Sequence, residues 1–231
     1  MDSKDTNQKL TADEPRTLTA YRQLRQDIVA GRHLPGEKLR VEHLKNEYKV
    51  GAGTLREALA LLVSDSLVIP SNQRGFRVSP MSLDDLEDLT RTRTMLECEA
   101  LRDSIRAGDD EWEARVVSAY HTLSRAEKRL AQDPAGAFEE WEARNRAFHG
   151  ALISGCKSRW ILQFQSILYQ QSERYRRMSA TTAPSIPDSV HQEHRKLYEV
   201  AIARNETAAM ALLADHVHFA LIAIKNTGTL K

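Results

Sequence analysis

The 231-residue sequence has little of what marks several classes of protein. It holds only two cysteines, Cys98 and Cys156, and their wide separation argues against a disulfide framework or a zinc knuckle. We interpret both as buried or incidental thiols. No uninterrupted apolar run approaches the roughly 20 residues of a membrane-spanning helix. The polar opening Met1–Lys9 lacks the apolar stretch of a secretory signal. These absences predict a cytoplasmic protein that makes no membrane contact.

Charge is nearly balanced over the whole chain, with a formal net charge of +1, but it is distributed unevenly. Residues 16–80 carry 11 Lys or Arg against 6 Asp or Glu, whereas residues 81–231 carry 20 against 22. A local basic excess of this kind suits a segment that binds a polyanion. The chain is also long enough for two domains. We therefore predict a disordered arm over residues 1–15, a basic domain over 16–80 and a second domain over 81–231.

The basic segment shows apolar residues at helical spacing and then changes to strand spacing. The stretch Val50–Gly53 breaks the helical pattern, and Thr54 is placed to cap the helix that follows. A hairpin comes next, with its turn at about residues 70–73, and Pro80 closes the unit. Three short helices and a hairpin predict a winged helix-turn-helix. The predicted helices cover about residues 18–31, 41–48 and 54–64, and the strands cover 67–69 and 74–78.

From Leu83 onward no segment has a strand pattern. Glycine and proline divide the remainder into long amphipathic stretches, and Ser82 is placed to cap the first of them before two aspartates. The fold class is therefore mainly α, with an N-terminal winged helix-turn-helix and a C-terminal all-α six-helix bundle. Bundles of this kind enclose ligand or metal sites between their helices. The six helices are predicted at about residues 83–107, 110–131, 135–154, 158–179, 188–203 and 205–226.

Five short motifs follow one another across residues 18–80. They are Tyr21-x-x-Leu24-Arg25, Pro35-Gly36-Glu37-x-Leu39, Thr54-Leu55-Arg56-Glu57-Ala58-Leu59, Leu67-Val68 and Arg74-Gly75-Phe76-x-Val78. In order and spacing they resemble the GntR family of winged-helix regulators, which implies binding to double-stranded operator DNA. Family members often carry arginine where this chain has Ala52 and Glu42, so the operator sequence is not implied.

The predicted DNA contacts follow from how a recognition helix enters the major groove, with its N-terminal turn leading. Base-edge or phosphate contacts are predicted for the start of the third helix, minor-groove contacts for the wing tip, and phosphate contacts for the second helix. The alternative is that Arg56-Glu57 is only an exposed helix pair. The candidate DNA-binding residues are Arg40, Lys45, Thr54, Arg56, Arg74 and Gly75.

The second domain has a further set of short motifs: Arg93-x-x-Leu96-Glu97, Asn145-x-x-Phe148-His149, Glu193-His194 and His216. With them it resembles the all-helical effector domain of the FadR-like subgroup, often called FCD. It implies an effector-binding and dimerisation domain, and hence a homodimer.

A divalent metal site is the second implication of these motifs. Asn145 and His149 lie four residues apart and share one helical face, and His194 and His216 complete a set that suits zinc or nickel. The family commonly has aspartate at the position of Asn145, so we expect weaker metal binding, a site filled only together with the effector, or a site that is never filled. The alternative stays open that these histidines are hydrogen-bonded core residues.

Arginine is the expected partner of an organic acid, because its planar guanidinium pairs with a carboxylate through two hydrogen bonds. We predict Arg93 and Arg174 as effector-binding residues; interhelical or surface ion pairs are the alternative. The segments Gly108–Glu113 and Phe148–Cys156 are similar to glutarate-pathway repressors of this family, which implies glutarate or 2-hydroxyglutarate as effector.

The sequence thus predicts a non-enzymatic transcription regulator, a repressor released from its operator by a small dicarboxylate. Two alternatives remain. A metal-dependent enzyme on the bundle would need a general base, for which only Glu193 is near, and we expect Glu193 to point away from the histidines. An architectural DNA-binding protein with an inert body would bind DNA without sensing an acid.

Overall fold

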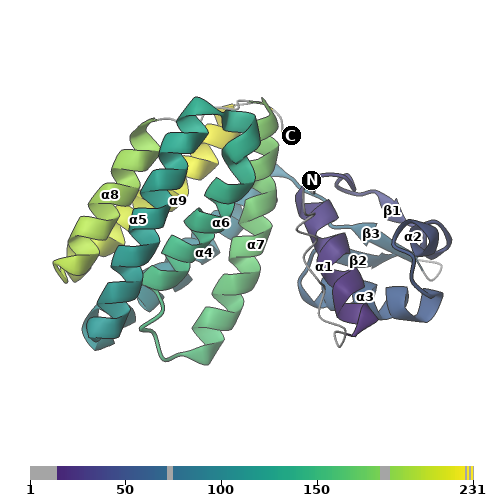
Figure 1. Ribbon diagram of the computed structural model, residues 1–231, viewed down its shortest axis with the longest axis horizontal. Helices are drawn as coiled ribbons and strands as arrows, with labels where there is room; N and C mark the ends of the chain where they lie inside the picture. Colours follow the sequence, from purple (N-terminus) through teal and green to yellow (C-terminus); the bar gives the residue numbers. More distant parts are fainter. Residues whose placement is uncertain (1–14, 72–74, 183–187, 227, 229, 231) are drawn as a thin grey trace, which may run out of the picture. The chain divides into compact units, whose positions relative to one another are not determined.

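The computed structural model describes residues 15–71, 75–182, 188–226, 228 and 230, and divides the chain into two compact units (Figure 1). The first unit is Met1–Ser79 and the second is Pro80–Lys231. Of the predicted N-terminal arm, only Pro15 lies within the described residues, where it precedes the first helix.

Three helices form most of the first unit: α1 (Arg16–Val29), α2 (Val41–Glu47) and α3 (Ala52–Ser64). Their inner faces carry leucine and alanine at helical spacing, so each helix buries one stripe. Leu24 of α1 and Leu55 of α3 are fully buried and belong to one core cluster, and α1 packs directly on α3. Burial of such side chains stabilises the unit by roughly 1.5–3 kcal/mol each.

A three-stranded antiparallel sheet completes the first unit, in the order β1-β3-β2. The strands are β1 (Lys38–Leu39), β2 (Val68–Ser71) and β3 (Gly75–Val78). The hairpin was predicted, but β1 was not, because two residues are too few to show an alternating pattern. The predicted turn also needs correction, since Pro70 and Ser71 continue β2 opposite Phe76 and Gly75. Proline is tolerated there because β2 is an edge strand.

Helix α3 begins earlier than predicted. It starts at Ala52 with Gly51 as N-cap, so Thr54 lies inside the first turn and does not cap the helix. The prediction that Gly53 breaks the helix was wrong. Glycine keeps its backbone N–H and costs a helix only conformational entropy, about 1 kcal/mol relative to alanine, so a single glycine in the first turn does not stop the helix from forming.

Six long helices form the second unit, as predicted, and each predicted start is within one residue of the observed one. Ser82 caps the first of them, accepting a hydrogen bond from the backbone N of Asp85 at 3.1 Å. The helices are α4 (Leu83–Ala107), α5 (Asp110–Gln132), α6 (Pro134–Leu152), α7 (Arg159–Thr182), α8 (Asp188–Ile202) and α9 (Glu206–Asn226).

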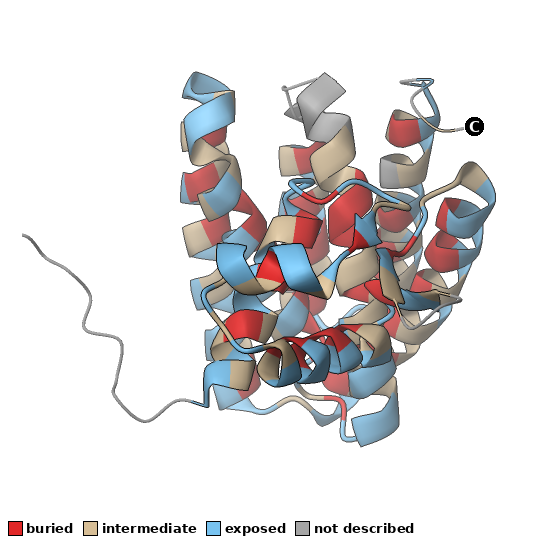
Figure 2. Ribbon diagram, turned by 90° about the vertical axis from the view of Figure 1, so that its right-hand side faces the viewer, coloured by how far each residue is buried: buried red, intermediate tan, exposed pale blue. Residues whose placement is uncertain are grey.

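The six helices pack as a ring around a shared interior. Helix α5 lies beside α6 and α8, α4 lies beside α7 and α9, and α8 lies beside α9. Ion pairs between α6 and α7, such as Glu142 with Arg176, close the ring. Trp112, Phe148 and Leu197 are fully buried in its core, and the helices are mostly exposed on their outer sides (Figure 2). Three different helices therefore contribute side chains to one interior.

Helix α9 is the one described helix that is long and apolar enough, by length and composition, to cross a membrane. Within the unit it packs against α4 and α8 and buries Leu213, Val217 and Ile224. Core helices of soluble bundles have this composition, so α9 is weak evidence for a membrane span.

Candidate functional site

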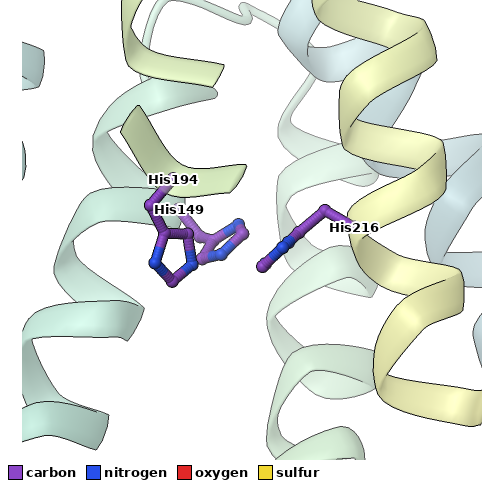
Figure 3. A group of neighbouring side chains, drawn as sticks. All are labelled: His149, His194 and His216. Carbon is purple, nitrogen blue, oxygen red and sulfur yellow. The ribbon is translucent and has the colours of Figure 1, made fainter. Parts of the chain in front are cut away.

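Three histidines from three helices meet in the interior of the second unit. His149 of α6, His194 of α8 and His216 of α9 each offer a ring nitrogen, and these atoms lie within 4.8 Å of one another. The rings of His194 and His216 are 4.6 Å apart between centroids, and His149 stacks on His216 at 5.2 Å. Figure 3 shows the three rings turned toward one another. This is a spacing at which one metal ion is held by three imidazoles.

Two buried polar atoms at the cluster lack a hydrogen-bond partner. They are Nε2 of His194, which is fully buried, and Oδ1 of Asn145. The amide nitrogen of Asn145 donates to the Tyr169 hydroxyl at 2.9 Å, which leaves its oxygen as the unpaired atom. Buried polar atoms without partners are rare and costly, and a missing ion is one of their explanations. The three imidazoles therefore fit a divalent cation, and Asn145, one helical turn before His149 on α6, is the candidate for a fourth ligand through its unpaired oxygen.

Carboxylates hold two of the three rings from the outside. Nδ1 of His194 lies 2.6 Å from Glu127 of α5, and Nδ1 of His216 lies 2.8 Å from Glu193 of α8. A carboxylate only accepts, so each Nδ1 carries a proton, and Nε2 is the nitrogen that a neutral ring would offer to a metal ion. The prediction that Glu193 points away from the histidines was wrong, because it reaches across to His216.

Burial keeps the rings of His149 and His194 neutral. It lowers the pKa of His149 well below the ordinary value, and the neighbouring His216 and His194 lower it further. Burial also lowers the pKa of His194 to about 4, although its hydrogen bond to Glu127 opposes the shift. Neutral imidazole is the form that binds a metal ion, so no proton has to be displaced from these two rings at neutral pH.

Two arginines flank the tyrosine beside the histidines. The guanidinium carbon of Arg93 lies 5.2 Å from the ring centre of Tyr169, and that of Arg176 lies 4.7 Å from it. Tyr169 in turn packs against His149, with ring centroids 5.9 Å apart. The charges of Arg93 and Arg176 both help to lower the pKa of His149, as expected for cations close to the cluster. The site thus combines metal-ligating groups with two cations that suit an organic anion.

Both arginines already have carboxylate partners. Arg93 pairs with Glu97, with the Nη2 to Oε1 distance 2.9 Å, and donates to the Ser172 hydroxyl at 2.6 Å. Arg176 donates from Nε to Glu142 at 3.1 Å. Glu97 and Glu142 are each 1% exposed, so these are buried ion pairs. An incoming carboxylate would have to compete with them.

Of the two neighbouring arginines Arg174 and Arg176 on α7, Arg176 is the one that lies over the Tyr169 ring, and an effector-binding role for Arg174 stays a prediction. Arg174 is buried, but it donates to Gln171 at 3.1 Å, and the charges that act on it come from Tyr175 and Asp85. Sequence reasoning missed Arg176 because both arginines lie within one charged run of α7. The available signal was helical phase, since Tyr169 and Arg176 are seven residues apart and share a face.

The start of α3 offers the predicted DNA-reading side chains. Arg56 is exposed, and Thr54 is partly exposed. On α2, Glu42 has a lowered pKa, first because of its hydrogen bond with Lys45 and also through the charge of Arg56. Lys45 is thus partly engaged by Glu42.

The wing supplies further cations near the sheet. Arg74 lies outside the described residues, while Gly75 begins β3, where a Cβ would lie 3.7 Å from the Lys38 side chain. Lys38 on β1 stands opposite Arg77 on β3, and both are exposed; sequence reasoning missed this pair together with β1. Arg40, the N-cap of α2, is also exposed.

Comparison with known families matches both units. Residues 16–78 match the family of bacterial regulatory proteins called the gntR family, and residues 88–219 match the FCD domain. Among solved structures, Escherichia coli McbR/YncC has a TM-score of 0.77 at 17% identity, covering 94% of this chain and all of that one. A gntR regulator of Rhodococcus has a TM-score of 0.73 at 24% identity, covering 94% of this chain and 99% of that one. These likenesses show the fold.

Sequence relatives carry the comparison further. The transcriptional regulator BphR of Paraburkholderia xenovorans is 50% identical over 91% of this chain and 86% of its own length. The transcriptional repressor GlaR of Escherichia coli is 37% identical over 87% of this chain and 92% of its own length. Such relatives are regulators and not enzymes, so the enzyme alternative is set aside. The chain belongs to the gntR family of bacterial regulatory proteins and carries an FCD effector-binding domain.

Proposed function

We propose that this regulator is a cytoplasmic homodimeric repressor whose FCD domain binds a divalent metal and a short dicarboxylate, and which leaves its operator when the acid binds. The observation that carries the proposal is the interior of the second unit. There, His194 Nε2 and Asn145 Oδ1 are unpartnered, and Tyr169, which contacts Asn145 and His149, is flanked by two arginines. The same chain also has a DNA-binding fold.

The DNA-binding part of the proposal uses the exposed start of α3. Arg56 and Thr54 contact base edges or phosphates in the major groove, Arg40 and Lys45 contact phosphates, and Gly75 brings the wing backbone close to the minor groove. A single winged helix-turn-helix of this size neutralises too few phosphates for tight specific binding. Two copies related by a two-fold axis therefore bind a palindromic operator.

The second copy has apolar surface available to it. Trp160 and Phe164 on α7 are 53% and 51% exposed and stack on each other, and aromatic residues are enriched in dimer interfaces. Sedimentation or light scattering of the purified chain tests the dimer.

The sensing part assigns a role to each group in the bundle. His149, His194 and His216, with Asn145, hold zinc or nickel, and the bound ion offers open positions to a chelating oxygen. Arg93 and Arg176 pair with the carboxylates of an acid of the glutarate or 2-hydroxyglutarate type.

Binding of the acid rearranges ion pairs on α4. An acid that takes Arg93 releases Glu97, which belongs to the helix that begins three residues after Pro80. A rearrangement of α4 would therefore act on a helix that directly follows the DNA-binding unit in the sequence. Linkage requires that the acid bind more tightly to the DNA-free form. The repressor name of GlaR supports this direction of control.

A thermal-shift screen of short organic acids, with and without zinc, tests the sensing proposal. We expect a stabilising shift with a five-carbon diacid in the presence of zinc, because a ligand that binds only the native state stabilises it. The exposed Arg91→Met variant should respond like the wild type, and Arg93→Met should not. No shift with any acid, with or without zinc, would leave an architectural DNA-binding protein as the better account.

A further inference from the structure

The four candidate metal ligands carry no negative charge. His149 and His194 are neutral, and Asn145 offers an amide oxygen where a carboxylate would add an anion. A divalent ion among neutral ligands in a buried site needs nearby negative charge to balance it. This inference rests on the proposed metal site and concerns what makes that site attract a cation.

The arginines near the cluster do not disturb the charge balance. Arg93 is neutralised by Glu97, and Arg176 by Glu142. Two carboxylates remain at the histidines, Glu127 and Glu193. Together they carry the two negative charges that a divalent ion requires.

Glu127 is the more buried of the two carboxylates and the more fully hydrogen-bonded. Its side chain is 8% exposed, and both of its oxygens are used: one accepts from Nδ1 of His194 and the other from Nδ1 of His191. His194 itself is fully buried. The Glu127 carboxylate of α5 is therefore a buried anion next to the candidate ligand His194, and His191 of α8 helps to hold it in place. Glu193 plays the same part at His216, with a side chain that is 26% exposed.

We propose that Glu127 and Glu193 are positioning residues that supply, through His194 and His216, the negative charge that Asn145 does not. Each carboxylate fixes its ring with Nε2 free and raises the basicity of that nitrogen, as carboxylates behind metal-binding histidines do. The site then resembles one with an anionic ligand in its affinity for a cation, although its four ligands are neutral.

The test is zinc affinity of the full chain, measured by competition with a chromophoric chelator. Glu127→Gln and Glu193→Gln keep the size and a hydrogen-bond acceptor but remove the charge, and each should weaken zinc binding by about 10- to 100-fold. Adding Asn145→Asp to Glu127→Gln should restore most of the lost affinity, because the anion is returned as a ligand. Glu199→Gln, on an exposed ion pair of α8, is the matched control and should bind zinc like the wild type.

Cobalt(II) absorption of the same variants gives a readout that a merely structural role would not change. A shifted absorption band in Glu127→Gln, with an unchanged melting temperature of the metal-free protein, supports the proposal. Wild-type zinc affinity in a folded Glu127→Gln or Glu193→Gln variant overturns it and leaves the proposed function standing. If the wild type binds neither zinc nor cobalt, the metal site itself is refuted. If Glu127→Gln does not fold, the more exposed Glu193→Gln decides.

Discussion

The metal-free bundle should lose stability in mild acid because of His194. Burial lowers the pKa of this ring from 6.5 to about 4. The unfolded chain takes up a proton near the ordinary value, whereas the folded chain does so only near the lowered one. The contribution of His194 to stability is therefore fully present above the unfolded pKa and is lost as the pH falls toward the folded pKa. Between about pH 7.5 and about pH 5, linkage gives a loss of about 2 kcal/mol from this residue. The pKa of His149 is lowered as well, so it acts in the same direction.

Urea unfolding followed by tryptophan fluorescence reports on the second unit, which contains His194, because Trp112, Trp141 and Trp160 all lie in residues 80–231. With a chelator present, the wild type should lose about 2 kcal/mol more than His194→Gln across that pH range. His218→Gln, at an exposed position of α9, should keep the wild-type pH dependence. An identical loss in wild type and His194→Gln would refute the claim that the buried ring is held neutral.

Three further predictions follow from single contacts. Arg56→Ala should weaken operator binding and reduce the slope of log affinity against log salt by about 1, measured by fluorescence anisotropy; an unchanged slope would remove Arg56 from the interface. Arg176→Met leaves Glu142 buried without its cation and should cost about 3–5 kcal/mol in urea unfolding, so a wild-type value would contradict the buried pair. Gly108→Ala places a Cβ 2.5 Å from the Trp112 ring and 2.6 Å from the backbone oxygen of Ser104, and should destabilise the bundle by about 1–3 kcal/mol, which calorimetry would detect. An unchanged melting temperature would contradict this close packing around Gly108.

The fold could be predicted from the sequence because the residues that start and end its helices act locally. Ser82 and Asp109 cap α4 and α5 through side-chain hydrogen bonds, and Pro134 opens α6. Helix caps and breaks of this kind depend on a few neighbouring residues, so they can be recognised in the sequence without knowledge of the packing. Strand β1 was missed because two residues carry no period, and only pairing with β3 makes them a strand.

The residues of the candidate site could be predicted only in part from the sequence. His149, His194 and His216 were proposed together because family motifs contain them, and the structure brings them together. Glu127 was missed because nothing in the local sequence marks it, and Arg176 was missed because only its helical phase with Tyr169 distinguishes it from Arg174. Their roles depend on the rotation of α7 and on the contact of α5 with α8, which are properties of the packed bundle.

The most direct test of the account is release of operator DNA by the acid. Fluorescence anisotropy of the full chain on DNA from its own upstream region, with zinc and increasing glutarate or 2-hydroxyglutarate, compares the wild type with Arg93→Met and His149→Ala. We predict that the acid dissociates the wild-type complex and leaves both variant complexes intact. Equal dissociation of all three complexes, or of none, would contradict the claim that the interior of the bundle controls the DNA-binding head.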